Sequence, residues 1–113
     1  MVKPEAPELG DIVWLSFSPQ LGHEQAGRRP SLVLTPRFYN QPTKLCICCP
    51  ITTKIKGYPF EVILPEGLPV SGAVAADQAK SYDWEARNAE FITRAPEQVL
   101  TATLDKLHAL LKG

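Results

Sequence analysis

Eleven prolines scattered singly along 113 residues divide this chain into short segments. Proline fixes φ and lacks a backbone N–H, so it ends helices and is excluded from the middle of central strands. The hydrophobic share of 44% excludes intrinsic disorder, which requires few large apolar residues. A chain of this length holds one core, so we expect a single domain, residues 1–113, of many short elements.

The segments between the prolines are rich in β-branched and aromatic residues, which predicts strands. The predicted strands are residues 10–17, 31–35, 45–52, 60–64, 72–79 and, as a short sixth, 89–93. After Pro96 the apolar residues recur at helical spacing, at Leu100, Leu104, Leu107 and Leu111. This spacing predicts an amphipathic C-terminal helix whose leucine stripe packs on a sheet. Together these elements predict a mostly β fold, a small, curled antiparallel β-barrel of five to six strands.

The cysteines and the absence of long apolar runs indicate the cellular compartment of the protein. No run is long enough to cross a bilayer and the start is no secretion signal, so we expect a cytoplasmic protein without a membrane partner. Cys46, Cys48 and Cys49 crowd into one predicted strand, a poor disulfide framework that suits a reducing compartment. The histidines, His23 and His108, are far from them, so we expect buried thiols and no metal site.

Positive charge is concentrated in one stretch, although the net charge is zero. Residues 28–56 hold six basic residues and no acidic one: Arg28, Arg29, Arg37, Lys44, Lys54 and Lys56. Such a stretch can bind a polyanion locally. The alternative is a solvated surface that binds nothing.

Five sequence blocks, taken in order, carry a family resemblance. They are residues 10–14 (GDIVW), 24–30 (EQAGRRP), 50–53 (PITT), 56–62 (KGYPFEV) and 76–81 (ADQAKS). Their sequence and order resemble the MazF/PemK family of bacterial toxins over nearly the whole chain. The resemblance implies an SH3-like barrel that forms a homodimer. It also implies a sequence-specific endoribonuclease that cleaves single-stranded RNA and is held inactive by a cognate antitoxin.

The resemblance also implies a catalytic pair, because the family's catalytic arginine and threonine match Arg29 and Thr52. A guanidinium offers phosphate a bidentate fork, and a threonine hydroxyl can donate to a phosphoryl oxygen. Neither is a plausible base, so Glu24 is the better candidate for taking the 2′-hydroxyl proton. This chemistry needs no metal or cofactor and leaves 2′,3′-cyclic phosphate and 5′-hydroxyl ends. Alternatively, Arg29 pairs with Glu24 to fix its loop, and Thr52 satisfies backbone groups in a turn.

Other residues suit contacts with RNA. Phe17 can stack on a base, although a strand phenylalanine is more often core, and the amides and carboxylate of Gln25, Gln78 and Asp77 can read base edges. Asp77 can instead be structural and hold a loop arginine. The remaining predicted RNA-binding residues are Arg28, Lys54 and Lys56. Relatives often have histidine where this chain has Arg28, so we expect a different pH dependence here.

The predicted partners follow from the basic groove and the resemblance. An acidic, extended antitoxin segment can block such a groove by mimicking phosphates. The chain has no helix-turn-helix pattern, so we expect no specific DNA binding by this chain alone. Two other functions remain open: a gyrase-poisoning toxin of the same barrel fold, and a non-catalytic SH3-like binding module.

Overall fold

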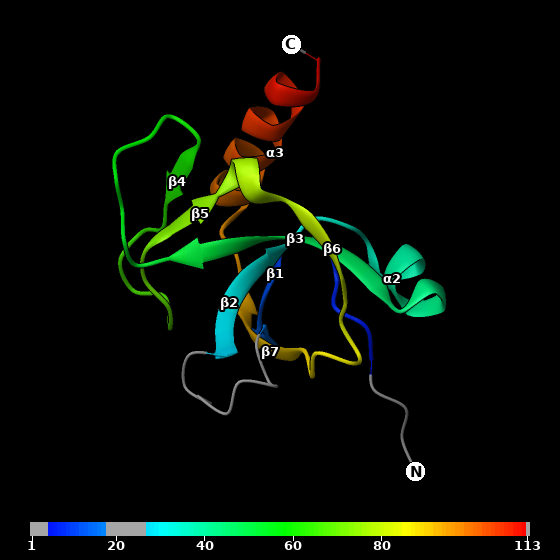
Figure 1. Ribbon diagram of the computed structural model, residues 1–113. Coiled ribbons are helices and arrows are strands. Elements are labelled where there is room, and N and C mark those ends of the chain that lie inside the picture. Colours follow the sequence, from blue (N-terminus) through cyan, green and yellow to red (C-terminus); the bar gives the residue numbers. More distant parts are fainter. Residues whose placement is uncertain (1–4, 18–26, 113) are drawn as a thin grey trace.

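The computed structural model describes residues 5–17 and 27–112, in which seven strands form a strongly curled antiparallel sheet (Figure 1). The strands are β1 Asp11–Ser16, β2 Arg28–Val33, β3 Leu45–Thr52, β4 Glu61–Ile63, β5 Ala73–Ala75, β6 Lys80–Asp83 and β7 Glu90–Arg94. The helices are α2 Arg37–Thr43, the 3-10 turn η2 Ala76–Gln78 and α3 Glu97–Lys112. The strand order is β4-β5-β3-β2-β1-β7, with β6 paired to β3.

The long strand β3 organises this sheet because it pairs with three others. β2 lies along one side, with Ser31 opposite Pro50. On the other side, β6 pairs with Leu45–Cys48 and β5 pairs with Ile51 and Thr52. Pro50 therefore lies where the ladder passes from one partner to the next, a position in which its missing N–H is tolerated.

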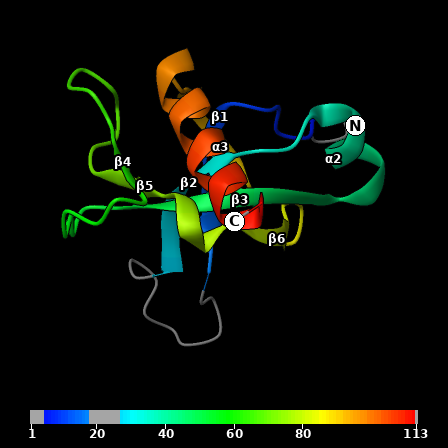
Figure 2. The same ribbon diagram turned by 90° about the horizontal axis from the view of Figure 1, so that it is seen from above.

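The two faces of the sheet bury separate cores, since successive residues of a strand point to opposite sides. One core, covered by α3, holds Ile12, Leu32, Cys49, Ile51, Val62, Val74 and Val99. The other holds Val13, Leu15, Val33, Cys46, Cys48 and Trp84. All three cysteines are buried and unlinked, as the sequence predicts. Figure 2 shows α3 lying across one face of the sheet.

The packing of α3 differs from the predicted leucine stripe. Its buried residues are Val99 and Thr103, with Leu100 and Leu107 partly buried beside them. Leu104, Leu110 and Leu111 are exposed, Leu111 to 77%. Helix α3 packs on η2 and β4, and its C-terminal turns extend past the sheet (Figure 1), so there is no sheet beneath them to cover these leucines.

The predicted mostly β antiparallel fold with a C-terminal helix is confirmed, with three differences in detail. The predicted strand 72–79 is the short β5 followed by η2. Strand β6 and helix α2 were not predicted from the sequence, and the described residues hold seven strands rather than five or six. The sheet is strongly curled, but within residues 5–17 and 27–112 its terminal strands β4 and β7 do not pair to close a barrel.

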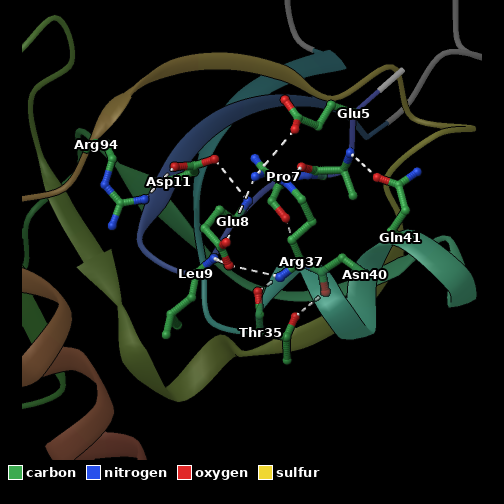
Figure 3. A network of polar contacts seen from close by, with 11 residues as sticks. Glu5, Pro7, Glu8, Leu9, Asp11, Thr35, Arg37, Asn40, Gln41 and Arg94 are labelled. Carbon is green, nitrogen blue, oxygen red and sulfur yellow. Dashed lines mark hydrogen bonds and ion pairs between the residues drawn. The ribbon is translucent and has the colours of Figure 1, made fainter. Parts of the chain in front are cut away.

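Helix α2 depends on distant residues, which is why its own sequence did not reveal it. Its N-cap is Pro36, which offers no capping side chain, and Pro42 lies inside it. The Glu8 carboxylate instead accepts the N–H of Arg37 at 2.9 Å, as Figure 3 shows. This bond and a second from the N–H of Leu9 lower the pKa of Glu8.

A buried amide completes this network (Figure 3). Asn40, on α2, donates to the carbonyls of Pro7 and Thr35, each at 2.8 Å. The main-chain carbonyl of Asn40 accepts the indole N–H of the buried Trp84 at 2.8 Å. The segment before β1, helix α2 and the turn after β6 are thus fixed together. Among the described helices, none has the length and apolar character needed to span a membrane.

Candidate functional site

Arg29 and Thr52 both lie just past the point where the pairing of β2 with β3 ends. Ser31 opposite Pro50 is the last pair, and Arg29 and Thr52 each lie two residues beyond it. A shift of two residues keeps the same face of the sheet, so both side chains point to the same side. Both residues line two adjoining cavities of about 290 and 340 Å³. The structure therefore brings together the two residues that the sequence analysis paired.

The hydroxyl of Thr52 is held by the turn that follows β3. Its Oγ1 accepts the N–H of Lys54 at 3.0 Å. Thr52 thus satisfies a backbone group in a turn, which was the alternative to a catalytic role. This bond uses an oxygen lone pair, so the hydroxyl proton can still be donated to a ligand. The turn thus orients the hydroxyl without consuming its donor capacity.

Arg29 and its neighbour Arg28 have different surroundings, since they point to opposite faces of β2. Arg29 is exposed and, in the part of the chain that the structure describes, makes no ion pair. Arg28 is held by Ser16 Oγ at 3.2 Å and by Glu90 Oε1 at 2.8 Å, and it lines neither cavity. Arg29 is exposed and lines both cavities, whereas Arg28 lines neither. An RNA contact by Arg28 stays a prediction.

The 290 Å³ cavity gathers most of the other predicted site residues. Lys54 and Lys56 come from the loop between β3 and β4, and Asp77 and Gln78 come from η2. With Arg29, the lining carries three cationic side chains against the carboxylates of Asp77 and Glu61. We call this lining, with Thr52, the Arg29–Thr52 cleft.

Two further residues of this cleft, Tyr58 and Glu61, were not singled out from the sequence. Tyr58 is 58% exposed, and the Lys56 ammonium lies 5.8 Å from the centre of its ring. The signal for Tyr58 was an aromatic residue beside lysine and glycine in a loop. Glu61 is the second residue of the predicted strand 60–64 and carried no such signal.

Phe17 lies outside this cleft, in a separate aromatic cluster. Its ring is half-buried and packs edge-on against Tyr82, with the ring centres 5.1 Å apart. The guanidinium of Arg87 lies 5.1 Å from the centre of the Tyr82 ring. Stacking of Phe17 on a base stays a prediction. Glu24 and Gln25 lie outside the described residues.

The groups in the Arg29–Thr52 cleft match the needs of a phosphorylated ligand. An arginine fork, an oriented hydroxyl and two lysines all donate hydrogen bonds to oxygen, and phosphate offers only acceptors. The nearby carboxylate and amide of Asp77 and Gln78 suit polar groups beside a phosphate. Fold and cleft together define a small, curled β protein with a cleft suited to a phosphate-containing ligand.

Comparison with known proteins gives the family. The model of the PemK-like, MazF-like toxins of type II toxin–antitoxin systems matches residues 8–111, and the chain belongs to this family. It is 49% identical over 100 residues to the endoribonuclease toxin MazF of Escherichia coli K12, covering 88% of this chain and 89% of that protein.

Solved structures agree with this assignment. A crystal structure of MazF from Deinococcus radiodurans superposes with a TM-score of 0.87 at 52% identity, covering 97% of this chain and all of that one. A MazE–MazF structure from the same organism gives a TM-score of 0.86 at 47% identity, covering 96% and 97%. Likeness at this identity supports the same fold along almost the entire chain.

Proposed function

We propose that this chain is a sequence-specific endoribonuclease toxin that cleaves single-stranded RNA without a metal ion. Membership of the toxin family and the 49% identical endoribonuclease support the activity. One structural observation carries it to particular atoms: Arg29 and Thr52, 23 positions apart in sequence, line the same two cavities. A scissile phosphate placed there meets both side chains.

In this mechanism the 2′-oxygen of the RNA attacks the adjacent phosphorus, and the bond from phosphorus to the 5′-oxygen breaks. The Arg29 fork binds the two non-bridging oxygens, and the Thr52 hydroxyl donates to one of them as charge develops. Glu24 takes the 2′-proton, and the leaving 5′-oxygen takes its proton from water. The products carry 2′,3′-cyclic phosphate and 5′-hydroxyl ends.

RNA recognition is assigned to the rest of the cleft and its surroundings. Lys54 and Lys56 hold flanking phosphates, and Asp77 and Gln78 read base edges. The other proposed contacts are Phe17, Gln25 and Arg28. Phe17 reaches a base only at the exposed part of its half-buried ring.

The partners are a cognate antitoxin and a second copy of the chain. One of the solved relatives is a MazE–MazF structure, which supports neutralisation by an antitoxin. An acidic extended segment is suited to the three cationic side chains of the cleft. The exposed Leu104, Leu110 and Leu111 of α3 form an apolar face that supports a homodimer. The proposal places the toxin in the cytoplasm, with no specific DNA binding by this chain alone.

The test incubates purified protein with a long, weakly structured RNA in the presence of a chelator, followed by mapping of the ends. We expect 5′-hydroxyl and 2′,3′-cyclic phosphate ends at one short recurring sequence, and no cleavage by Arg29→Ala. Cleavage that requires a metal, or 5′-phosphate ends, contradicts the mechanism. Intact RNA with broken DNA after induction in cells would instead favour a gyrase poison.

A further inference from the structure

The carboxylate of Glu61 is surrounded by the backbone of the loop that precedes it. Its Oε1 accepts the N–H of Gly57 at 2.8 Å, and those of Lys56 and Tyr58 at 3.2 Å each. Its Oε2 lies 3.1 Å from the same Lys56 nitrogen. Three consecutive backbone amides therefore converge on one side chain.

This arrangement is an anion-binding nest, in which successive N–H groups form a concave site. Gly57 supplies the left-handed conformation that turns its N–H inward, with φ at +79°. A Cβ at Gly57 would meet nothing within 4 Å, so the backbone conformation and not space requires glycine there. The nest is filled by Glu61 of the same chain, so its amides are not offered to a ligand.

The loop is tied down at two other points. At its start, the Thr52 hydroxyl accepts the Lys54 N–H at 3.0 Å. Near its end, the Lys106 ammonium on α3 donates to the carbonyl of Pro59 at 2.7 Å. Residues 54–59 are exposed and belong to no helix or strand, so their conformation is fixed by these side-chain hydrogen bonds and not by strand pairing.

We propose that Glu61 is a positioning residue for RNA binding: its carboxylate holds the backbone of Lys56, Gly57 and Tyr58 so that the loop lines the Arg29–Thr52 cleft. The assignment rests on the proposed function. The side chains that the loop contributes to this lining are Lys54, Lys56 and Tyr58, beside Arg29 and Thr52. Without the carboxylate, the three amides turn to water and the loop must be ordered by the RNA itself, which weakens binding.

Charge alone predicts the opposite effect. Glu61 is one of two carboxylates in the lining of the cleft, and RNA is a polyanion. Removing a negative charge from such a site strengthens polyanion binding if electrostatics is all that matters. The direction of the change in KM therefore separates a positioning role from a purely electrostatic one.

The experiment measures kcat and KM for RNA cleavage by the full chain and by Glu61→Gln, Glu61→Asp and the control Glu66→Gln. Glu66 is exposed in the turn after β4 and lines neither cavity, and its variant makes the same charge change as Glu61→Gln. We expect Glu61→Gln to raise KM about tenfold with kcat within about twofold of the parent, because the reacting groups are untouched. Glu61→Asp keeps the charge, but its side chain is shorter by one methylene and does not reach the three amides, so we expect KM to rise here too. Glu66→Gln should leave both kcat and KM unchanged.

Hydrogen exchange of the native protein gives a second readout that needs no RNA. The amide protons of Lys56, Gly57 and Tyr58 should exchange at least about tenfold faster in both Glu61 variants than in the parent, with the β3 amides unchanged. An unchanged or lowered KM in Glu61→Gln, parental KM in Glu61→Asp, or retained protection of the three amides overturns the assignment. If the parent protein does not cleave RNA, the proposed function fails and the assignment with it. A cleaving parent with an indifferent Glu61 overturns the assignment alone.

Discussion

Gly72 lies directly against the carbonyl group of Thr52, so closely that a Cβ at this position would overlap it. The two residues belong to neighbouring segments of the sheet, where Ala73 pairs with Thr52. Gly72 also has a positive φ of +124°, a conformation that side chains disfavour. The position of the Thr52 main chain, and with it the hydroxyl in the cleft, depends on the absence of a side chain at Gly72.

Gly72→Ala is therefore expected to displace Thr52 and to lower both kcat and stability. The overlap is with backbone, which cannot swing away, so we expect a loss of about 2–4 kcal/mol of unfolding free energy. Denaturant unfolding and single-turnover RNA cleavage measure the two effects. Gly67→Ala is the matched control, because Gly67 also has a positive φ, of +98°, but open space around it. Equal behaviour of the two variants would show that backbone strain and not the contact with Thr52 matters.

Arg29→Lys tests whether the shape of the guanidinium matters in addition to its charge. Lysine keeps the positive charge but cannot present two parallel N–H groups to phosphate. We expect kcat to fall about 10²-fold, the usual effect of losing one preorganised donor to a developing oxyanion, with KM changed much less. Arg94→Lys is the control, since Arg94 pairs with Asp11 and lines a different cavity. Full activity of Arg29→Lys would show that only the positive charge of Arg29 matters, and not the shape of its guanidinium.

Much of this site was predictable because its residues lie on or next to strands of strong pattern. Thr52 ends the predicted strand 45–52, and Arg29 lies two residues before the predicted strand 31–35, which in the structure begins earlier, at Arg28. The family blocks then indicated which polar residues at the strand ends to consider. Lys54 and Lys56 were considered for the same reason, since they follow the predicted strand 45–52. Asp77 and Gln78 lie near the end of the predicted strand 72–79.

The parts that escaped prediction depend on contacts between distant segments. Helix α2 is capped by Glu8, 29 positions away from Arg37, and no local pattern reveals such a cap. The nest around Glu61 depends on backbone amides, which every sequence has. The leucine stripe was misplaced because helical periodicity shows which residues share a face, but not how far the supporting sheet extends. Leu111 is thus on the predicted face and still 77% exposed.

The cap supplied by Glu8 predicts a pH-dependent contribution to stability. The two backbone N–H bonds lower the pKa of Glu8 in the folded protein below its ordinary value of 4.5. A lowered folded pKa stabilises the protein above the unfolded pKa, and this stabilisation is lost as the pH falls through the lowered value. At neutral pH we expect Glu8→Gln to cost about 0.5–1 kcal/mol, a modest value because the side chain is partly exposed.

Thermal unfolding followed by circular dichroism at pH 7 and at about pH 3 measures this difference. The difference in unfolding temperature between the parent and Glu8→Gln should narrow as the pH is lowered, because protonation of the Glu8 carboxylate removes the charge that the glutamine variant lacks. Glu66→Gln provides the reference for loss of an exposed carboxylate. A gap that stays constant across this range would mean that the shape of the side chain, and not its charge, caps α2.

The three buried thiols predict a protein that resists thiol reagents while it is folded. Burial raises the pKa of the Cys49 thiol to about 12, with a further contribution from the negative charge of Asp77. The pKa of Cys48 is also raised, chiefly by its hydrogen bond with Cys46, whose sulfur lies 3.3 Å away, and by burial. The thiolate is the reactive form, so Cys48 and Cys49 are unreactive at pH 8 both because they are protonated and because reagents cannot reach them.

Mass spectrometry after exposure to iodoacetamide should find no adduct on Cys48 or Cys49 in the native protein and adducts on all three cysteines in guanidinium chloride. Rapid labelling of Cys49 without denaturant would mean that strand β3 opens far more readily than its central place in the sheet implies.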